Sequence, residues 1–160
     1  MERLRTFDDD LVFSGITAGV IAGAVMLAAE MASTIVLGGS LESPLRLAAS
    51  VVLGPAALSF AYPFTSAAIV GGGVQVILAS VYGVLFVAVL TRANRWDAGA
   101  RLLLPYGVAF GALIWVLNYL ILGETIFPQF AVVEHLWNGI IAHAVCFGFV
   151  LGAACLSGRG

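Results

Sequence analysis

The sequence contains four long stretches of apolar residues, each close to the length that a helix needs to cross a lipid bilayer. They cover about 11–37, 67–90, 102–122 and 132–156. About 20 residues at 1.5 Å per residue span a hydrocarbon core about 30 Å thick. Backbone polar groups in that core must pair within the protein, which restricts spanning segments to helices or closed barrels. We therefore expect an all-α integral membrane protein, a four-transmembrane-helix bundle forming a single domain over residues 1–160.

The composition agrees with a chain that lies almost entirely in the bilayer. Hydrophobic residues make up 61% of the chain and charged residues 10%, whereas about a quarter of the residues of a soluble domain are charged. The mean hydropathy is +1.06. A net charge of −2 and the lack of a basic cluster argue against a nucleic-acid partner. No Ser-His-Asp ordering, HExxH motif or metal-rich spacing occurs, so an enzyme is less expected than a non-catalytic protein.

The placement of arginine predicts the orientation of the bundle. The chain has no lysine, and of its seven arginines Arg46 alone lies on the side away from the termini. The others precede the first stretch, separate the second from the third, or follow the fourth: Arg3, Arg5, Arg92, Arg95, Arg101 and Arg159. Since positive residues favour the cytoplasmic side, we expect both termini in the cytoplasm and a multi-pass protein of the inner or plasma membrane.

The long connection between the first two stretches contains a short apolar segment at about 44–54. Pro44 favours the first turn of a helix, and Gly54 favours its end. Because the segment is too short to span, we predict an interfacial helix on the outer membrane surface, with Arg46 turned to the headgroups. The alternative is a lid over an outward-facing cavity.

Small residues mark the expected contacts between helices. Glycines recur at four-residue spacing in three of the stretches: Gly15, Gly19 and Gly23, then Gly107 and Gly111, then Gly148 and Gly152. In lipid such positions let helix backbones approach closely. Contact with a cofactor ring or another subunit is the alternative. The run at 71–73, three glycines, predicts either a break in the second helix or a close crossing.

The sequence also contains a faint internal repeat. The step Tyr82-Gly83 aligns with Phe147-Gly148, and the glycines of the first and third stretches can be aligned in the same phase. The repeat predicts two helical hairpins with the same orientation, as in some small transport proteins.

Four features together resemble the YagU-like group of small bacterial inner-membrane proteins. They are the glycine-rich first stretch, the Tyr82-Gly83 step, the segment PYGVAFGALIWVLNYLILG in the third stretch, and the run from His143 to Gly152. The resemblance covers most of the chain and implies a four-helix inner-membrane fold. It matches His143, whereas Gln75 or Leu78 stands near the place of a second histidine. The group has no settled biochemical role, so the resemblance implies no activity.

Polar or ionisable residues occur within or at the edge of the apolar stretches, in the half away from the termini. They are Glu30, Gln75, Asn118, Glu134, His135 and His143. An isolated Glu30 would cost roughly 2.5–3.5 kcal/mol at the membrane centre, so we expect it to be protonated, paired or facing water. If the first and fourth helices are neighbours, Glu30 and His143 lie within reach, directly or through Asn118 or a water. Alternatively, His143 is a neutral buried residue hydrogen-bonded across helices.

These residues leave three functions open. The first is a non-catalytic accessory subunit of a larger respiratory or photosynthetic complex, packed against other membrane subunits or a second copy. The second is a small transporter or proton-conducting protein with Glu30 and His143 as the relay. The third is a haem- or quinone-binding subunit with His143 as a single axial ligand, since His135 lies about 12 Å away along the helix and cannot share one metal. A pigment or a lipid is a further candidate occupant.

Overall fold

The computed structural model describes residues 9–96, 99–130 and 136–157, which fold into helices joined by short connections. Four helices in this part of the chain are long and apolar enough to cross a membrane: Asp9–Val36, Phe64–Arg92, Ala100–Thr125 and Trp137–Ser157. The predicted all-α fold with four such helices is confirmed, and the described residues contain no strand. The bounds differ from the predicted ones by at most three residues where both can be compared. The predicted start at 132 lies outside the described residues.

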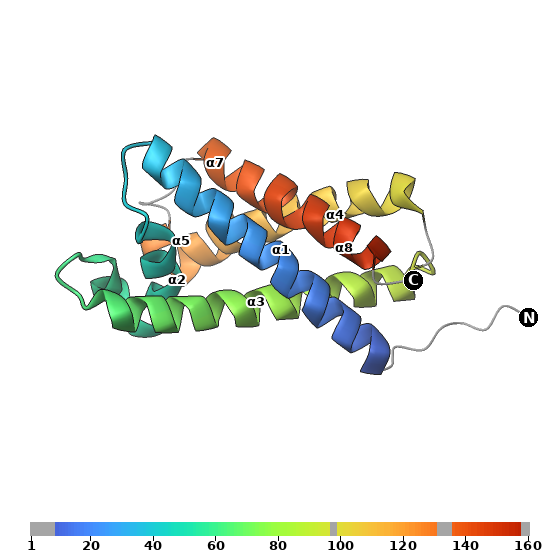
Figure 1. Cartoon of the computed structure of the whole chain (residues 1–160), viewed down its shortest axis with the longest axis horizontal. Helices are drawn as coiled ribbons and strands as arrows, with labels where there is room; N and C mark the ends of the chain where they lie inside the picture. The colour runs from blue at the N-terminus through green and yellow to red at the C-terminus, as the bar shows by residue number, and fades with distance from the viewer. Residues whose placement is uncertain (1–8, 97–98, 131–135, 158–160) are drawn as a thin grey trace, which may run out of the picture.

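The long helices form two antiparallel pairs (Figure 1). In the first pair, α1 (Asp9–Val36) packs on α3 (Phe64–Arg92). In the second, the third spanning helix comprises α4 (Ala100–Trp115), η2 (Val116–Leu122) and α5 (Gly123–Thr125). It packs on the fourth, which comprises α7 (Leu136–Ile141), η3 (Ala142–Phe149) and α8 (Val150–Ser157). Two shorter helices, α2 (Ser43–Leu53) and η1 (Pro55–Leu58), lie in the connection from α1 to α3.

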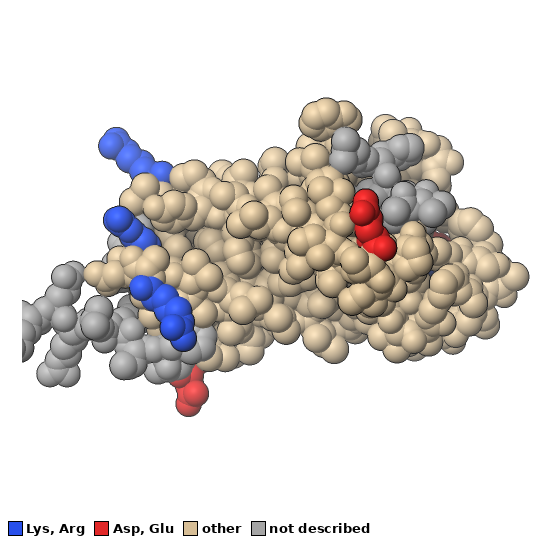
Figure 2. Space-filling view, turned by 180° about the vertical axis from the view of Figure 1, so that it is seen from behind, with Lys and Arg blue, Asp and Glu red and all other residues tan. Residues whose placement is uncertain are grey.

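Basic side chains gather at one end of the bundle. α1 begins and α8 ends there, beside the connection from α3 to α4 (Figure 1). The exposed Arg92, Arg95 and Arg101 belong to this end, which we call the arginine end. Figure 2 shows the basic side chains there with a wide uncharged band beyond them. Apolar side chains exposed on the bundle, such as Ile69 and Leu113 at 71% and 65%, suit contact with lipid tails.

The helices of each pair cross where glycines face each other. A Cβ atom at Gly83 would lie 2.8 Å from Gly19 Cα, and one at Gly148 would lie 3.2 Å from Gly111 Cα. At both glycines, backbone atoms of the opposite helix lie where a Cβ atom would be. The two helices of each pair can pack this closely only because these positions have no side chain. The remaining glycines of the predicted contacts also meet the opposite helix of their pair: Gly15, Gly23, Gly107 and Gly152.

The two crossings are equivalent in position. Gly83 of α3 lies against the backbone of Gly15 and Gly19, while Gly148 of η3 lies against that of Gly107 and Gly111. These are the contacts that the aligned aromatic-glycine steps predict. The two pairs therefore match in these glycine contacts, and α2 has no counterpart among the described residues of the second pair.

The half of the bundle nearer the arginine end is filled by apolar side chains. Leu11, Phe86, Leu103, Leu151 and Cys155 come from all four spanning helices, and each is at most 2% exposed. These side chains form the apolar core of this half.

Away from the crossing, α1 and α3 diverge toward the opposite end of the bundle, and α2 lies between them there (Figure 1). α2 crosses α3 at Gly71, where an added Cβ would lie 3.2 Å from Ala49 N. α3 continues unbroken through the three glycines at 71–73. The prediction of a break is therefore wrong, and its alternative, a close crossing, is what the structure contains.

Candidate functional site

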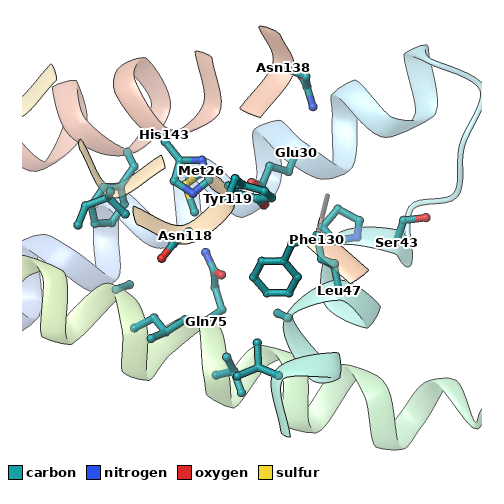
Figure 3. Close-up of a pocket in the computed structure, with 18 of the residues that line it drawn as sticks. Met26, Glu30, Ser43, Leu47, Gln75, Asn118, Tyr119, Phe130, Asn138 and His143 are labelled. Carbon is teal, nitrogen blue, oxygen red and sulfur yellow. The ribbon is translucent and has the colours of Figure 1, made fainter. Parts of the chain in front are cut away.

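A cavity of about 280 Å³ lies between the two helix pairs, in the half of the bundle away from the arginine end (Figure 3). It forms where the helices diverge beyond their glycine crossings. All four spanning helices and α2 contribute to its wall, with Met26, Leu47, Leu78, Ile114 and Phe147 among its apolar residues. The cavity is thus an amphipathic space inside the part of the protein expected to lie in the membrane.

The structure brings four of the predicted polar residues to this cavity. Glu30 of α1, Gln75 of α3, Asn118 of η2 and His143 of η3 all line it. Figure 3 shows the four side chains converging from their separate helices. The other two, Glu134 and His135, lie outside the described residues. Residues between 25 and 113 positions apart in the sequence therefore share one site.

His143 is 4% exposed and has a defined hydrogen-bond partner. Its Nδ1 lies 3.0 Å from the carbonyl oxygen of Gly139, one turn earlier in the same helix. Because a carbonyl can only accept, Nδ1 carries the proton in this bond, and Nε2 is the acceptor of the neutral ring. The ring also meets Tyr119 edge-on at 5.5 Å between centroids. The partner found for His143 is thus on its own helix rather than across helices.

Two amides tie the wall of the cavity together. Tyr82 Oη donates to Asn118 Oδ1 at 2.7 Å, which joins α3 to η2 and hence one helix pair to the other. Gln75 Nε2 donates to the carbonyl oxygen of Gly23 at 3.4 Å, just beyond the α1–α3 crossing. These bonds fix the separation of the helices around the cavity, since polar bonds between helices persist where water is scarce.

The second helix pair contains two π-helical segments, and both line the cavity. η2 supplies Asn118 and Tyr119, and η3 supplies His143 and Phe147. π-helical turns are rare and are frequently found at functional sites. α1 and α3, the equivalent helices of the first pair, are α-helical throughout. The π-helical segments that distinguish the second pair from the first therefore lie at the cavity.

Five polar residues of the cavity were not predicted as site residues: Thr34, Ser43, Tyr82, Tyr119 and Asn138. Tyrosine is common near membrane interfaces, so a tyrosine in an apolar stretch does not by itself indicate a binding site. Asn138 follows the same rule that selects Asn118, a polar residue in an apolar stretch, and that rule would have found it. Tyr119 is marked only by its position directly after Asn118.

α2 forms one wall of the cavity through Ser43, Leu47 and Val51. Its other contacts link it to both helix pairs: it packs on α3, and Gln129 Nε2 donates to Ser50 Oγ at 3.3 Å. The lid alternative for this helix thus has a structural basis, because α2 covers a cavity rather than lying apart from the bundle.

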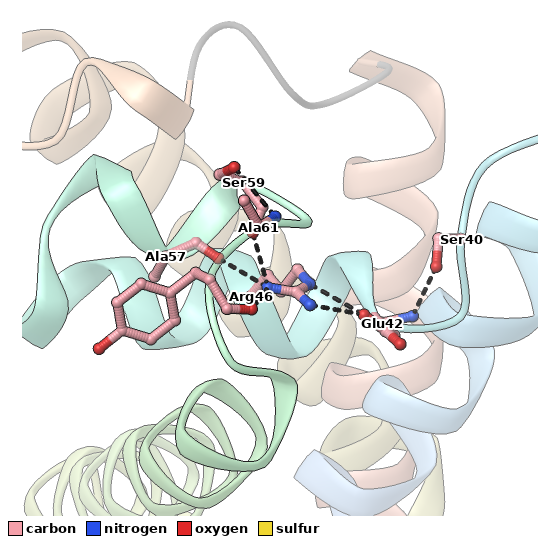
Figure 4. Close-up of polar contacts among 7 residues, drawn as sticks. Ser40, Glu42, Arg46, Ala57, Ser59 and Ala61 are labelled. Atoms are coloured by element: carbon pink, nitrogen blue, oxygen red, sulfur yellow. Dashed lines mark hydrogen bonds and ion pairs between the residues drawn. The ribbon is translucent and has the colours of Figure 1, made fainter.

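Arg46 holds α2 to the connection that follows it (Figure 4). Its Nη2 and Nε donate to Glu42 Oε2 at 2.7 and 3.0 Å. Its Nη1 donates to three carbonyl oxygens, those of Ala57, Ser59 and Tyr62, at 3.3, 2.9 and 3.1 Å. The residue is 3% exposed, so the prediction that it faces the headgroups is wrong. A guanidinium can leave water here because carbonyls and a carboxylate replace its hydration.

Glu30 is the one charged side chain that lines the cavity, within the part of the chain that the structure describes. The described arginines are engaged by Glu42 or lie at the arginine end. No group of three or more His, Cys, Asp or Glu side chains among the described residues could hold a metal ion. The cavity therefore combines one acid, several neutral hydrogen-bonding groups and aromatic rings.

Comparison of the chain with models of known families, with curated proteins and with solved structures finds no match. The resemblance to the YagU-like group therefore stays a prediction. The cavity and the residues around it are the features from which a function can be inferred.

Proposed function

We propose that the protein is a small multi-pass transporter of the inner or plasma membrane, with Glu30 and His143 as a proton relay. The observation that carries the proposal is that both residues line one cavity with Gln75 and Asn118. Ionisable residues within a membrane are costly, and where they face a cavity they mark pathways for ions or substrates. The tautomer of His143 supports a relay, because its Nε2 can accept a proton while Nδ1 stays bonded to Gly139.

The repeat supports transport over a purely structural role. In transporters built from repeats, the binding site lies near the middle of the membrane at the interface of the repeats. The cavity lies between the two helix pairs, and the half toward the arginine end is packed closed. A site closed toward the cytoplasmic side agrees with one of the two states that alternating access requires.

The arrangement of charge supports an orientation with both termini in the cytoplasm. Arg92, Arg95 and Arg101 are exposed at the end where α1 begins and α8 ends, as the distribution of positive residues favours. In this orientation the cavity lies in the outer half of the membrane. α2 then lies at the outer interface as the cover of the cavity.

Labelling of single cysteines would test the orientation. In a background without Cys146 and Cys155, we expect Ala61→Cys, in the exposed connection before α3, to react with a membrane-impermeant maleimide in intact cells. Ala93→Cys, exposed after α3, should react only after the membrane is permeabilised. Reaction at position 93 alone in intact cells would contradict the proposed orientation and indicate that both termini lie outside.

Proton flux into liposomes would test the function itself. With an imposed pH gradient and a pH-sensitive dye inside, we expect wild-type protein to dissipate the gradient faster than empty liposomes do. Glu30→Gln and His143→Ala should each reduce the rate toward that of empty liposomes, because each removes a proton-accepting group from the relay. Glu124→Gln is the matched control, since Glu124 is exposed and outside the cavity wall. Equal rates for all four proteins would refute the relay.

The other expected functions stay predictions. An accessory subunit needs a partner surface, but lipid accounts equally well for exposed apolar side chains such as Phe13. A haem or quinone subunit with His143 would be revealed by the optical spectrum of the gently purified protein.

A further inference from the structure

We infer that the cavity selects a small amphipathic organic cation, a protonated amine or quaternary ammonium ion that carries an apolar group. The inference rests on the proposed function, because it names the class of molecule that the transport site binds. It starts from the sign of the charge in the wall, where Glu30 is an acid and no described arginine or lysine lines the cavity. A cation in this space would meet a carboxylate, and the pairing would offset the cost of taking both charges out of water.

Aromatic rings beside Glu30 supply the second part of the argument. Tyr119 lies 5.6 Å from Phe130 and 5.5 Å from His143 between ring centroids, and Tyr82 lies 6.4 Å from Phe147. All five residues line the cavity with Glu30, and Figure 3 labels Tyr119, Phe130 and Glu30 among the residues around it. The faces of aromatic rings attract ammonium groups, and cages of such rings recognise quaternary ammonium ligands.

The apolar part of the wall defines the rest of the ligand. Met26, Leu47, Val51, Val74 and Ile114 line the same cavity and offer hydrocarbon contacts to a ring or short alkyl group. The volume of about 280 Å³ is near the lower end of the roughly 300–1,000 Å³ usual for ligand sites. A molecule with one aromatic ring and one ammonium group fits this description better than a large lipid does.

Other classes of ligand agree less well with the wall. An anion would be repelled by Glu30, at a cost that membrane burial increases, and no arginine or lysine of the described residues lines the cavity to bind it. A metal cation needs several anionic or imidazole ligands, and the described residues contain no such group. A neutral molecule could form hydrogen bonds to the amides and to the carboxylate, but it would gain no charge pairing with Glu30.

Three probes with the same carbon skeleton would test the inference: 2-phenylethylammonium, 2-phenylethanol and phenylacetate. They carry a positive, a neutral and a negative group at pH 7. Binding is measured by titration calorimetry of the purified protein in mild detergent, with protein-free micelles as the blank. We expect saturable binding of the cation, at least about tenfold tighter than binding of the alcohol or the carboxylate.

Variants locate the binding in this cavity. Glu30→Gln, which keeps the size of the side chain, should remove the preference for the cation over the alcohol. Tyr119→Leu should weaken cation binding more than alcohol binding, because the ring face acts on the charge. Glu124→Gln should bind as the wild type does. Each variant is used only if it elutes from size exclusion as the wild type does.

The inference is overturned if wild-type protein binds the alcohol or phenylacetate as tightly as the cation, or binds no cation. It is also overturned if Glu30→Gln keeps the preference. The comparison of probes on wild-type protein needs no variant, so a folding defect cannot obscure it. Because binding in detergent requires no transport, cation-selective binding without flux in liposomes would refute the proposed transport and leave the ligand class standing.

Discussion

Gly83→Ala is expected to destabilise the protein by about 3 kcal/mol, the upper end of the usual range for overpacking. The added methyl group would lie 2.8 Å from Gly19 Cα and would also meet the backbone of Gly15. A flexible side chain could move aside, but helix backbone cannot move without separating α1 from α3. The loss would appear as a lower midpoint of thermal unfolding in detergent, with less monodisperse protein on size exclusion.

Gly73→Ala is the matched control, because it makes the same change in the same helix. Gly73 is exposed, and an added Cβ there would have no atom within 4 Å. Alanine favours a helix over glycine by up to about 1 kcal/mol, so this variant should be as stable as the wild type or more so. Equal destabilisation at positions 73 and 83 would mean that the crossing is not close.

Gly148→Ala extends the same prediction to the second helix pair. Its methyl group would lie 3.2 Å from Gly111 Cα and would face the backbone of Gly107. If the pairs are units of one repeat, the loss should resemble that of Gly83→Ala.

The fold could be predicted from the sequence because the bilayer restricts it so strongly. Long apolar stretches set the number and the bounds of the helices to within three residues. Glycines such as Gly19 and Gly111 indicated the close contacts, because glycine lets the backbones of two helices touch in the membrane. The position of α2 was not determined in this way. Its apolar face suits lipid and protein equally, and only the divergence of α1 from α3 decides between them.

Part of the site could be predicted for a related reason. Glu30, Gln75, Asn118 and His143 are expensive in hydrocarbon, so their presence alone indicated a shared polar space. Tyrosines carry no such signal, which is why Tyr82 was missed although it bonds Asn118.

Arg46 was placed wrongly because a charge in a short connection is normally a hydrated one. Its enclosure depends on the carbonyls of residues 57–62, which approach it only through the turn that follows α2. The sequence shows neither the turn nor the direction of those carbonyls. The side chains of Phe60 and Phe64 complete the enclosure, at 5.2 and 5.6 Å from the guanidinium carbon.

The structure makes Arg46→Met a strongly destabilising substitution. Methionine keeps much of the apolar stem but removes the donor to three carbonyl oxygens and to Glu42. Removing one partner of a buried pair costs about 3–5 kcal/mol. We expect the lower value, about 3 kcal/mol, because the Glu42 side chain is 34% exposed and can regain water. The loss would be measured as a lower unfolding midpoint in detergent.

Arg46→Lys and Arg95→Met distinguish the effect of the Arg46 hydrogen bonds from the effect of its positive charge. A lysine ammonium is a point charge with three donors and cannot serve both Glu42 and the carbonyls as the planar guanidinium does, so Arg46→Lys should recover only part of the loss. Arg95 is exposed, and Arg95→Met should leave the unfolding midpoint unchanged. Full recovery by lysine would show that a positive charge suffices and that the carbonyl contacts contribute little.

Loss of Arg46 should also act on the cavity, because the helix that it holds supplies Leu47 and Val51 to the wall. In Arg46→Met, the amides of α2 (Ser43–Leu53) should exchange with deuterium faster, whereas those around the α1–α3 crossing should keep their protection. Binding of 2-phenylethylammonium should weaken although Glu30 is unchanged. Faster exchange in α2 with unaltered binding would mean that α2 lies beside the ligand site without closing it. That result would favour the interpretation of α2 as an interfacial helix on the membrane surface.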